Sequence, residues 1–187
     1  SVTGELIKVG KLPSIKIDTP NINVIKGNLI GNLNDGFIQS MKVLEGGRIG
    51  IAALATGIAR GAMEDSIQHV KERVQFGKPL AALQSIQFKI ADMAAEIEAA
   101  RLLTHRAAFT RDQGLPYNHY SSMAKLYASE VSMRAAHQCV QMLGGSGYME
   151  EYHAQRYFRD AKLMEIGEGT SEIQRLVISR EVFRQLS

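Results

Sequence analysis

The sequence predicts an all-α fold, an up-and-down helical bundle, preceded by a short β-rich segment. Three observations lead to this prediction. After Asp35 the residues Ala, Leu, Met, Glu, Gln, Lys and Arg dominate, and this composition favours helices. None of the four prolines falls inside a proposed helix, where it would remove a backbone hydrogen bond. The proposed helices are long and their connections are short, so neighbouring helices should pack antiparallel.

The first part of the chain, residues 1–34, differs in composition from the rest. It is rich in Ile, Val, Thr, Asn and Gly, and apolar and polar residues alternate over 14–18 and 21–24. This alternation predicts two or three short strands with turns between them. So few strands bury little surface by themselves, and we expect them to pack on something else. We therefore divide the chain into a β-rich segment, 1–34, and a helical domain, 35–187.

Five helices follow from the spacing of apolar residues and from glycine and proline stop signals. We expect them at residues 36–76, 83–112, 119–143, 153–161 and 170–183. Gly46-Gly47 should weaken the first helix, because glycine is a poor helix former. The third helix should have one apolar side, formed by Met123, Leu126, Met133, Val140 and Leu143.

Composition argues against several classes of protein. The 187 residues are 45% hydrophobic, which is typical of a folded domain. Their net charge of +3 gives no reason to expect nucleic-acid binding. A single cysteine rules out an internal disulfide and suits a reducing compartment, and the five histidines lack the spacing of metal ligands. The longest uncharged apolar run, 49–59, is too short to span a bilayer. We expect no metal, no membrane span and a cytoplasmic location, or the mitochondrial matrix for a eukaryotic parent.

The segment from Ile166 to Gln174 is the main candidate for chemistry. Glu168 lies between two glycines, which leave both faces of its carboxylate open to a ligand. Thr170 or Ser171 should begin the next helix, with Gln174 placed for a capping box. The alternative is that Glu168 is an ordinary acid favoured near a helix N-terminus. The residues by themselves leave both interpretations open.

Several separated blocks extend this pattern over most of the chain. In this order they resemble the C-terminal helical domain of the acyl-CoA dehydrogenase family, from about residue 28 to residue 186. The blocks are Gly36-Phe37, Gly47-Arg48, the R-x-x-F-G-x-P-L segment at 73–80 with Gln84, Ala91-Asp92-Met93, the glycine-rich segment 141–148, Arg159-Asp160-Ala161, the E-G-T-S segment 168–171, Gln174-Arg175 and Arg180.

The resemblance implies an FAD enzyme that oxidises an acyl-CoA thioester, of short or medium chain length, to its trans-2-enoyl product. It implies that Glu168 is the base that removes the α-proton while the β-hydrogen leaves as hydride to the flavin. Gly169 and Arg48 are then expected at the substrate. The alternative for Arg48 is an ion pair near the start of the first helix. Gly167 stands where some relatives carry a bulky aromatic, so the preferred acyl chain stays open.

The resemblance also implies which residues bind FAD. Arg73, Gln75, Phe76 and Gln84 resemble a segment that holds FAD across a subunit interface, where a guanidinium suits a pyrophosphate. A second group resembles a loop near the adenine end of the cofactor and consists of Gln141, Gly144 and Gly145. Thr170 and Glu172 resemble positions that contact the flavin, although many relatives carry glutamine in place of Glu172.

The implied partners are an acyl-CoA substrate, an acceptor of the electron-transfer flavoprotein type and further copies of the chain in a dimer or tetramer. Residues 1–34 look like the tail of the family's middle β domain, which holds the flavin ring. We therefore expect the isolated chain to be an inactive fragment that binds FAD weakly or not at all. The alternative function is a non-catalytic helical module for oligomerisation or interaction, derived from the same family.

Overall fold

The computed structural model describes residues 4–9, 12–17, 30–32 and 34–186. The chain divides into two units, residues 1–40 and 41–187. In the first unit, β1 (Gly4–Val9) pairs antiparallel with β2 (Leu12–Ile17), in a register that runs from Gly4 opposite Ile17 to Val9 opposite Leu12. This hairpin confirms the β-rich start of the chain. The strand expected at 21–24 lies outside the described residues.

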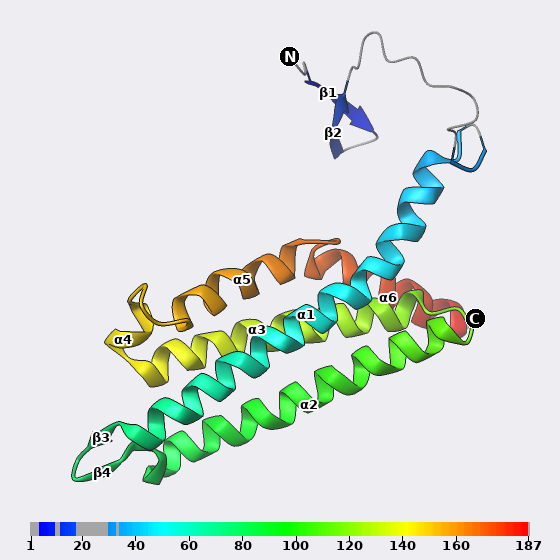
Figure 1. Ribbon diagram of the computed structural model, residues 1–187. Helices are drawn as coiled ribbons and strands as arrows, with labels where there is room; N and C mark the ends of the chain where they lie inside the picture. Colours follow the sequence, from blue (N-terminus) through cyan, green and yellow to red (C-terminus); the bar gives the residue numbers. More distant parts are fainter. Residues whose placement is uncertain (1–3, 10–11, 18–29, 33, 187) are drawn as a thin grey trace. The chain divides into compact units, whose positions relative to one another are not determined.

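The second unit is all-α, as the sequence predicts, and its long helices run alongside one another (Figure 1). Its helices and short strands are α1 (Gly36–Glu72, with its first residues in the other unit), β3 (Val74–Gln75), β4 (Lys78–Pro79), the 3-10 helix η2 (Leu80–Ala82), α2 (Gln84–Asp112), α3 (Asn118–Leu143), α4 (Gly145–Tyr148), α5 (Ala154–Ile166) and α6 (Ser171–Gln185).

The helix α1 is continuous through Gly46 and Gly47, where the sequence predicts a weak point. The expected end of this helix is wrong. The helix ends at Glu72 rather than at residue 76, because β3 and β4 form a tight antiparallel hairpin there. Phe76 and Gly77 make its turn with φ of +55° and +76°, a backbone conformation that a helix cannot contain.

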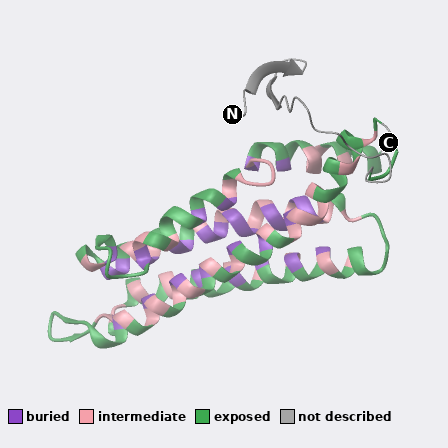
Figure 2. Ribbon diagram, turned by 45° about the horizontal axis from the view of Figure 1, so that its top comes forward, coloured by how far each residue is buried: buried purple, intermediate pink, exposed green. Residues whose placement is uncertain are grey.

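The core is centred on α3, which contacts α2, α4, α5 and α6 and is hydrogen-bonded to α1 through Arg48. Figure 2 shows the buried residues concentrated on the inward sides of the helices. The buried side of α3 is built mainly from small residues such as Ala124, Ala128 and Ser129, so several helices can approach it closely. Of the five residues expected on one apolar side of this helix, Leu143 is buried and the other four are half-buried.

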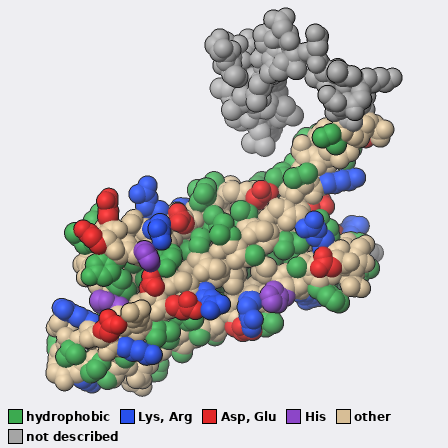
Figure 3. Space-filling model, in the orientation of Figure 1, with side chains coloured by type: hydrophobic (Ala, Val, Ile, Leu, Met, Phe, Trp, Pro, Cys, Tyr) green, Lys and Arg blue, Asp and Glu red, His purple; other side chains and the backbone are tan. Residues whose placement is uncertain are grey.

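The surface of the second unit mixes charges of both signs. On the face shown in Figure 3, Lys and Arg side chains lie among Asp and Glu side chains rather than in one patch. Within the part of the chain that the structure describes, no helix is long and apolar enough to cross a membrane. The same residues contain no group of three or more His, Cys, Asp or Glu side chains that could hold a metal ion.

Candidate active site

Glu168 lies in the short connection between α5 and α6, in an unusual backbone conformation. Its φ is +56°, and the next residue, Gly169, has a φ of +94°. A left-handed φ is uncommon for a residue with a side chain, and such strain gathers at functional sites. A Cβ on Gly169 would lie 2.8 Å from Nε2 of Gln174, so the connection needs glycine there.

The carboxylate of Glu168 points at the backbone of α1. A Cβ on Gly47 would lie 2.5 Å from Oε2 of Glu168 and 2.8 Å from its Cδ, so the carboxylate fills the space beside this glycine. Oε2 is buried and has no hydrogen-bond partner in the structure. A buried carboxylate oxygen without a donor is free to accept a proton from a bound molecule.

Arg48 follows Gly47 and is 8% exposed. Its Nη1 donates to Oδ1 of Asn118 at 2.5 Å and to the hydroxyl of Ser122 at 3.1 Å, while its buried Nε has no partner. Burial lowers the pKa of Arg48, and the carboxylates of Glu45 and Glu168 oppose this shift. The alternative expectation, an ion pair near the helix start, is not what the structure shows, because Arg48 lies well inside α1 and bonds neutral groups.

Two buried side chains hold the connection in place; the sequence indicated no role for Lys125 and only a capping role for Gln174. Lys125 of α3 is fully buried, and its Nζ donates to the carbonyl oxygens of Glu165 at 3.1 Å and Gly169 at 2.8 Å. Gln174 of α6 is also fully buried, and its Nε2 donates to the carbonyl oxygens of Glu168 at 3.2 Å and Gly169 at 2.9 Å.

A signal for part of this network was present in the sequence. Asn118, Ser122 and Lys125 are spaced four and three residues apart, so they share one face of a helix. Polar residues at that spacing within a buried helix indicate a shared hydrogen-bonding role.

The capping box expected for Gln174 is wrong. Thr170 is the N-cap of α6 and has no capping side-chain bond, and the amide of Gln174 donates to backbone carbonyls instead.

Thr170 and Glu172 lie at the start of α6, directly after Glu168 and Gly169. The pKa of Glu172 is lowered, first by its own backbone N–H and then by the hydroxyl of Thr170. A carboxylate is favoured in the first turn of a helix, where backbone N–H groups lack partners. Glu172 is exposed and Thr170 is half-buried, so both remain accessible beside Glu168.

Comparison with known proteins identifies the family of the chain. The family model described as the acyl-CoA dehydrogenase C-terminal domain matches residues 34–183. The chain belongs to the acyl-CoA dehydrogenase family.

Individual relatives support this assignment. The chain is 52% identical to a probable acyl-CoA dehydrogenase of Bacillus subtilis (strain 168), over 88% of this chain and 43% of that protein. It is 51% identical to the mitochondrial short-chain specific acyl-CoA dehydrogenase of Rattus norvegicus, over 85% of this chain and 39% of that protein. It superposes on butyryl-CoA dehydrogenase from Megasphaera elsdenii with a TM-score of 0.87 and 44% identity, over 91% of this chain and 45% of that chain. The chain thus spans less than half the length of these relatives.

The remaining residues that the acyl-CoA dehydrogenase resemblance selected lie away from Glu168. Arg73, Gln75 and Phe76 lie on and beside the β3–β4 hairpin, Gln84 begins α2, and all four are exposed. The hairpin follows the end of α1, 25 residues beyond Gly47 (72 − 47 = 25). At the rise of an α-helix this separation is about 37 Å. The structure therefore does not bring the hairpin residues together with Glu168.

A third group of selected residues lies where α3 ends. Gln141, Gly144 and Gly145 are exposed, and Gly144 has a φ of +62°. A Cβ on either glycine would meet no atom within 4 Å, so a ligand or another chain can approach this backbone.

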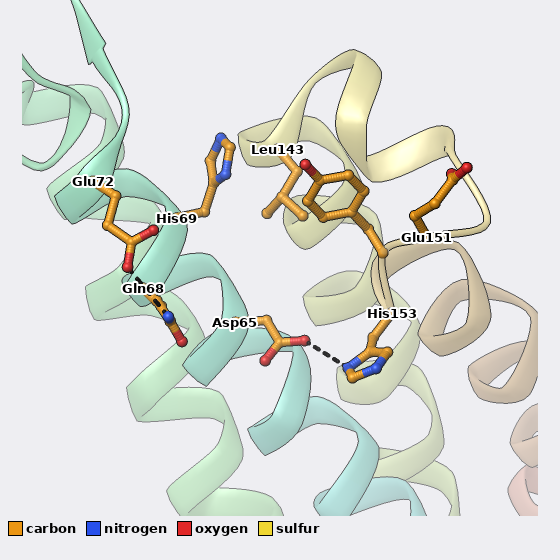
Figure 4. Close-up of a pocket in the computed structure, with 8 residues that line it drawn as sticks. Asp65, Gln68, His69, Glu72, Leu143, Glu151 and His153 are labelled. Atoms are coloured by element: carbon orange, nitrogen blue, oxygen red, sulfur yellow. Dashed lines mark hydrogen bonds and ion pairs between the residues drawn. The ribbon is translucent and has the colours of Figure 1, made fainter.

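The pocket in Figure 4 lies between α1 and the start of α5 and has a volume of about 240 Å³. A carboxylate oxygen of Asp65 lies 3.4 Å from Nδ1 of His153 and accepts a hydrogen bond from the hydroxyl of Tyr157 at 3.1 Å. None of the residues expected to bind FAD or the substrate lines this pocket.

Proposed function

We propose that this chain is the C-terminal part of an FAD-dependent acyl-CoA dehydrogenase that introduces a double bond between Cα and Cβ of a short- or medium-chain acyl-CoA, with Glu168 as the base. The observation that carries the proposal is the geometry of Glu168. Its carboxylate lies against the bare backbone of Gly47, with Oε2 buried and free of hydrogen-bond donors. Membership in the acyl-CoA dehydrogenase family supports the same reaction.

In this mechanism Glu168 accepts the α-proton of the thioester, which is weakly acidic and needs a positioned base. The backbone N–H of Glu168 donates to the thioester carbonyl and stabilises the negative charge that develops there. When bound, FAD supplies the acceptor for the β-hydride. Arg48 contributes a buried positive charge beside the site, held by Asn118 and Ser122.

Exposed groups beyond the end of α1 and at the end of α3 are chemically suited to contact FAD. Arg73 forms no ion pair with any residue that the structure describes, so its guanidinium is available to a pyrophosphate. Phe76 is 88% exposed, and Gly144 and Gly145 leave open space over their backbone. Because Arg73 and Phe76 lie about 37 Å along α1 from the Glu168 site, we assign them to the cofactor of a neighbouring copy, and we assign Thr170 and Glu172 to the flavin beside Glu168.

The proposal includes the wider setting of the enzyme. Residues 1–34 form the tail of the family's middle β domain, and residues 35–187 form the helical domain. Catalysis then requires the rest of the enzyme, and this stretch alone is inactive. The whole enzyme is a homo-oligomer in the cytoplasm, or in the mitochondrial matrix of a eukaryote, and passes its electrons to an acceptor of the electron-transfer flavoprotein type.

Replacement of the base tests the proposed function. In the whole enzyme, Glu168→Gln should leave FAD bound, as measured by flavin absorbance, and should abolish dehydrogenation of butyryl-CoA and octanoyl-CoA. Glutamine keeps the size and shape of the side chain but cannot act as a base for the proton. Normal turnover by this variant would show that the assignment of the base is wrong.

A further inference from the structure

We propose that Lys125 and Gln174 are positioning residues that hold the base, Glu168, in its reactive conformation. The inference rests on the proposed function, because it takes Glu168 as the base. Both side chains act through the backbone of the α5–α6 connection, to which they donate four hydrogen bonds.

Burial of the charged Lys125 side chain costs free energy. It is fully buried, and within the described chain its ammonium forms no ion pair with a carboxylate. Burial lowers the pKa of Lys125, and the nearby carboxylates of Glu165 and Glu172 counteract part of that effect. A methionine would fill similar space without desolvating a charge. What methionine cannot do is donate hydrogen bonds to two carbonyl oxygens at once.

Those two carbonyls belong to different elements. The carbonyl of Glu165 lies in the last turn of α5, where carbonyl groups lack helical partners and a positive charge is favoured. The carbonyl of Gly169 lies just before α6. Lys125 therefore fixes the separation between the end of α5 and the beginning of α6, and Glu168 lies between these two anchors.

Gln174 fixes the orientation of the peptide groups themselves. Its amide binds the carbonyl oxygens of Glu168 and Gly169, so the two peptide planes that follow the base cannot rotate independently. Both residues have a positive φ, which for Glu168 is strained. Without these donors the backbone would relax toward negative φ and turn the carboxylate away from Gly47.

The same face of α3 also supports the other side of the site. Asn118 and Ser122, about two turns and one turn before Lys125, hold the guanidinium of Arg48. One rigid helix therefore positions both the α1 side and the α5–α6 side of the base. Such support fixes the base to the fraction of an ångström that catalysis requires.

The test uses the whole FAD-loaded enzyme with butyryl-CoA. Lys125→Met removes both hydrogen bonds of Lys125 and keeps a side chain of similar volume. Lys125→Arg keeps a charged donor, and Glu168→Gln is the reference for loss of the base. Lys89→Met is the matched control, because half-buried Lys89 on α2 donates to Oε1 of Gln138 and does not reach the connection. The measurements are the FAD content, the rate of flavin reduction after rapid mixing, and KM against kcat.

We expect Lys125→Met to slow flavin reduction by about 10²-fold with FAD content and KM nearly unchanged, as a small displacement of the base would do. Lys125→Arg should recover part of the rate, and Lys89→Met should match the wild-type rate. If Lys125→Met reduces flavin at the wild-type rate while Glu168→Gln is inactive, the inference is wrong and the proposed function stands. An active Glu168→Gln enzyme would overturn the proposed function and the inference with it.

A second variant covers the case in which Lys125→Met does not fold with FAD. Gln174→Met removes the other two hydrogen bonds without changing any charge. We expect it to lower kcat and leave KM nearly unchanged. A wild-type kcat in a folded Gln174→Met enzyme would then overturn the inference.

Discussion

Gly47 and Glu168 share one space: a Cβ on Gly47 would lie 2.5 Å from Oε2 of Glu168. The two residues are far apart in sequence, and the contact joins the middle of α1 to the connection between α5 and α6. A glycine within a helix is destabilising by about 1 kcal/mol relative to alanine. Gly47 leaves the space that the carboxylate of Glu168 occupies.

Gly47→Ala should therefore separate activity from stability. The new methyl group displaces the carboxylate, and we expect kcat of the whole enzyme to fall about tenfold or more. The gain in helix propensity offsets the crowding, so the free energy of unfolding should change by less than about 1 kcal/mol. Gly50→Ala is the control: a Cβ there meets no atom within 4 Å, so this variant should keep its activity and gain stability. Equal activities for the two variants would contradict the prediction.

Removal of the buried guanidinium should destabilise the helical unit. Arg48→Met leaves the oxygens of Asn118 and Ser122 without their donor, which costs about 1–3 kcal/mol. Urea unfolding followed by circular dichroism measures this difference. Arg60→Met is the control, because the Arg60 side chain is 70% exposed and its ion pair with Glu64 contributes about 0.5 kcal/mol or less. The interpretation of Arg48 would be wrong if both variants lost the same stability.

The close packing of α1 can be tested with two alanines of that helix. Ala55 is fully buried in the core, whereas Ala53 is exposed. Ala55→Leu should lower the free energy of unfolding by about 1–3 kcal/mol through overpacking. Ala53→Leu should change it by no more than about 0.5 kcal/mol. Thermal or urea unfolding of both variants gives the comparison, and a well-tolerated leucine at position 55 would rule out close packing there.

Tyr157 should make stability depend on pH in the alkaline range. Burial, the hydrogen bond to Asp65 and the charge of Asp65 raise the pKa of Tyr157 from 10.0 to about 12. Between these two pH values the unfolded chain has released this proton while the folded chain keeps it, so stability falls as pH rises from about 10 to about 12. Tyr157→Phe should show a shallower fall. The ultraviolet absorbance of tyrosinate, compared between the two proteins, locates the midpoint directly.

The hairpin residues should affect cofactor binding without affecting the fold. Arg73→Met in the whole enzyme should raise the Kd for FAD about tenfold or more, because a charged hydrogen bond to a pyrophosphate is worth about 1.5–3 kcal/mol. Titration of the apoenzyme with FAD measures this. Arg101→Met, on the exposed side of α2, should leave the Kd unchanged. An unaltered Kd in Arg73→Met would remove this residue from the cofactor site.

Helix positions could be predicted from the sequence because local residues determine them. Gly114 and Pro116 mark the end of α2, and Gly144 marks the end of α3, where its left-handed backbone stops the helix. The helix α1 is continuous through Gly46-Gly47, because helix propensity is small beside tertiary packing. Which side of α3 is buried was not evident from its large apolar residues, since small side chains are buried where helices approach closely.

The candidate site was only partly predictable. The two glycines around Glu168 gave a local signal for an open carboxylate. Lys125 and Gln174 gave none of this kind, because their partners are backbone carbonyl oxygens, which every residue carries. A hydrogen bond to a backbone atom leaves no trace in the sequence of its acceptor. Such partners are therefore found only when the fold is known.

The left-handed backbone at Glu168 affects which substitutions this position is expected to accept during evolution. Strain of this kind costs about 1–3 kcal/mol, and glycine would relieve it. Glu168→Gly is therefore expected to strengthen the fold while it removes the carboxylate. Under the proposed function, stability favours glycine at this position and catalysis favours glutamate. A lineage released from selection for catalysis should then lose Glu168 early and keep a folded helical domain.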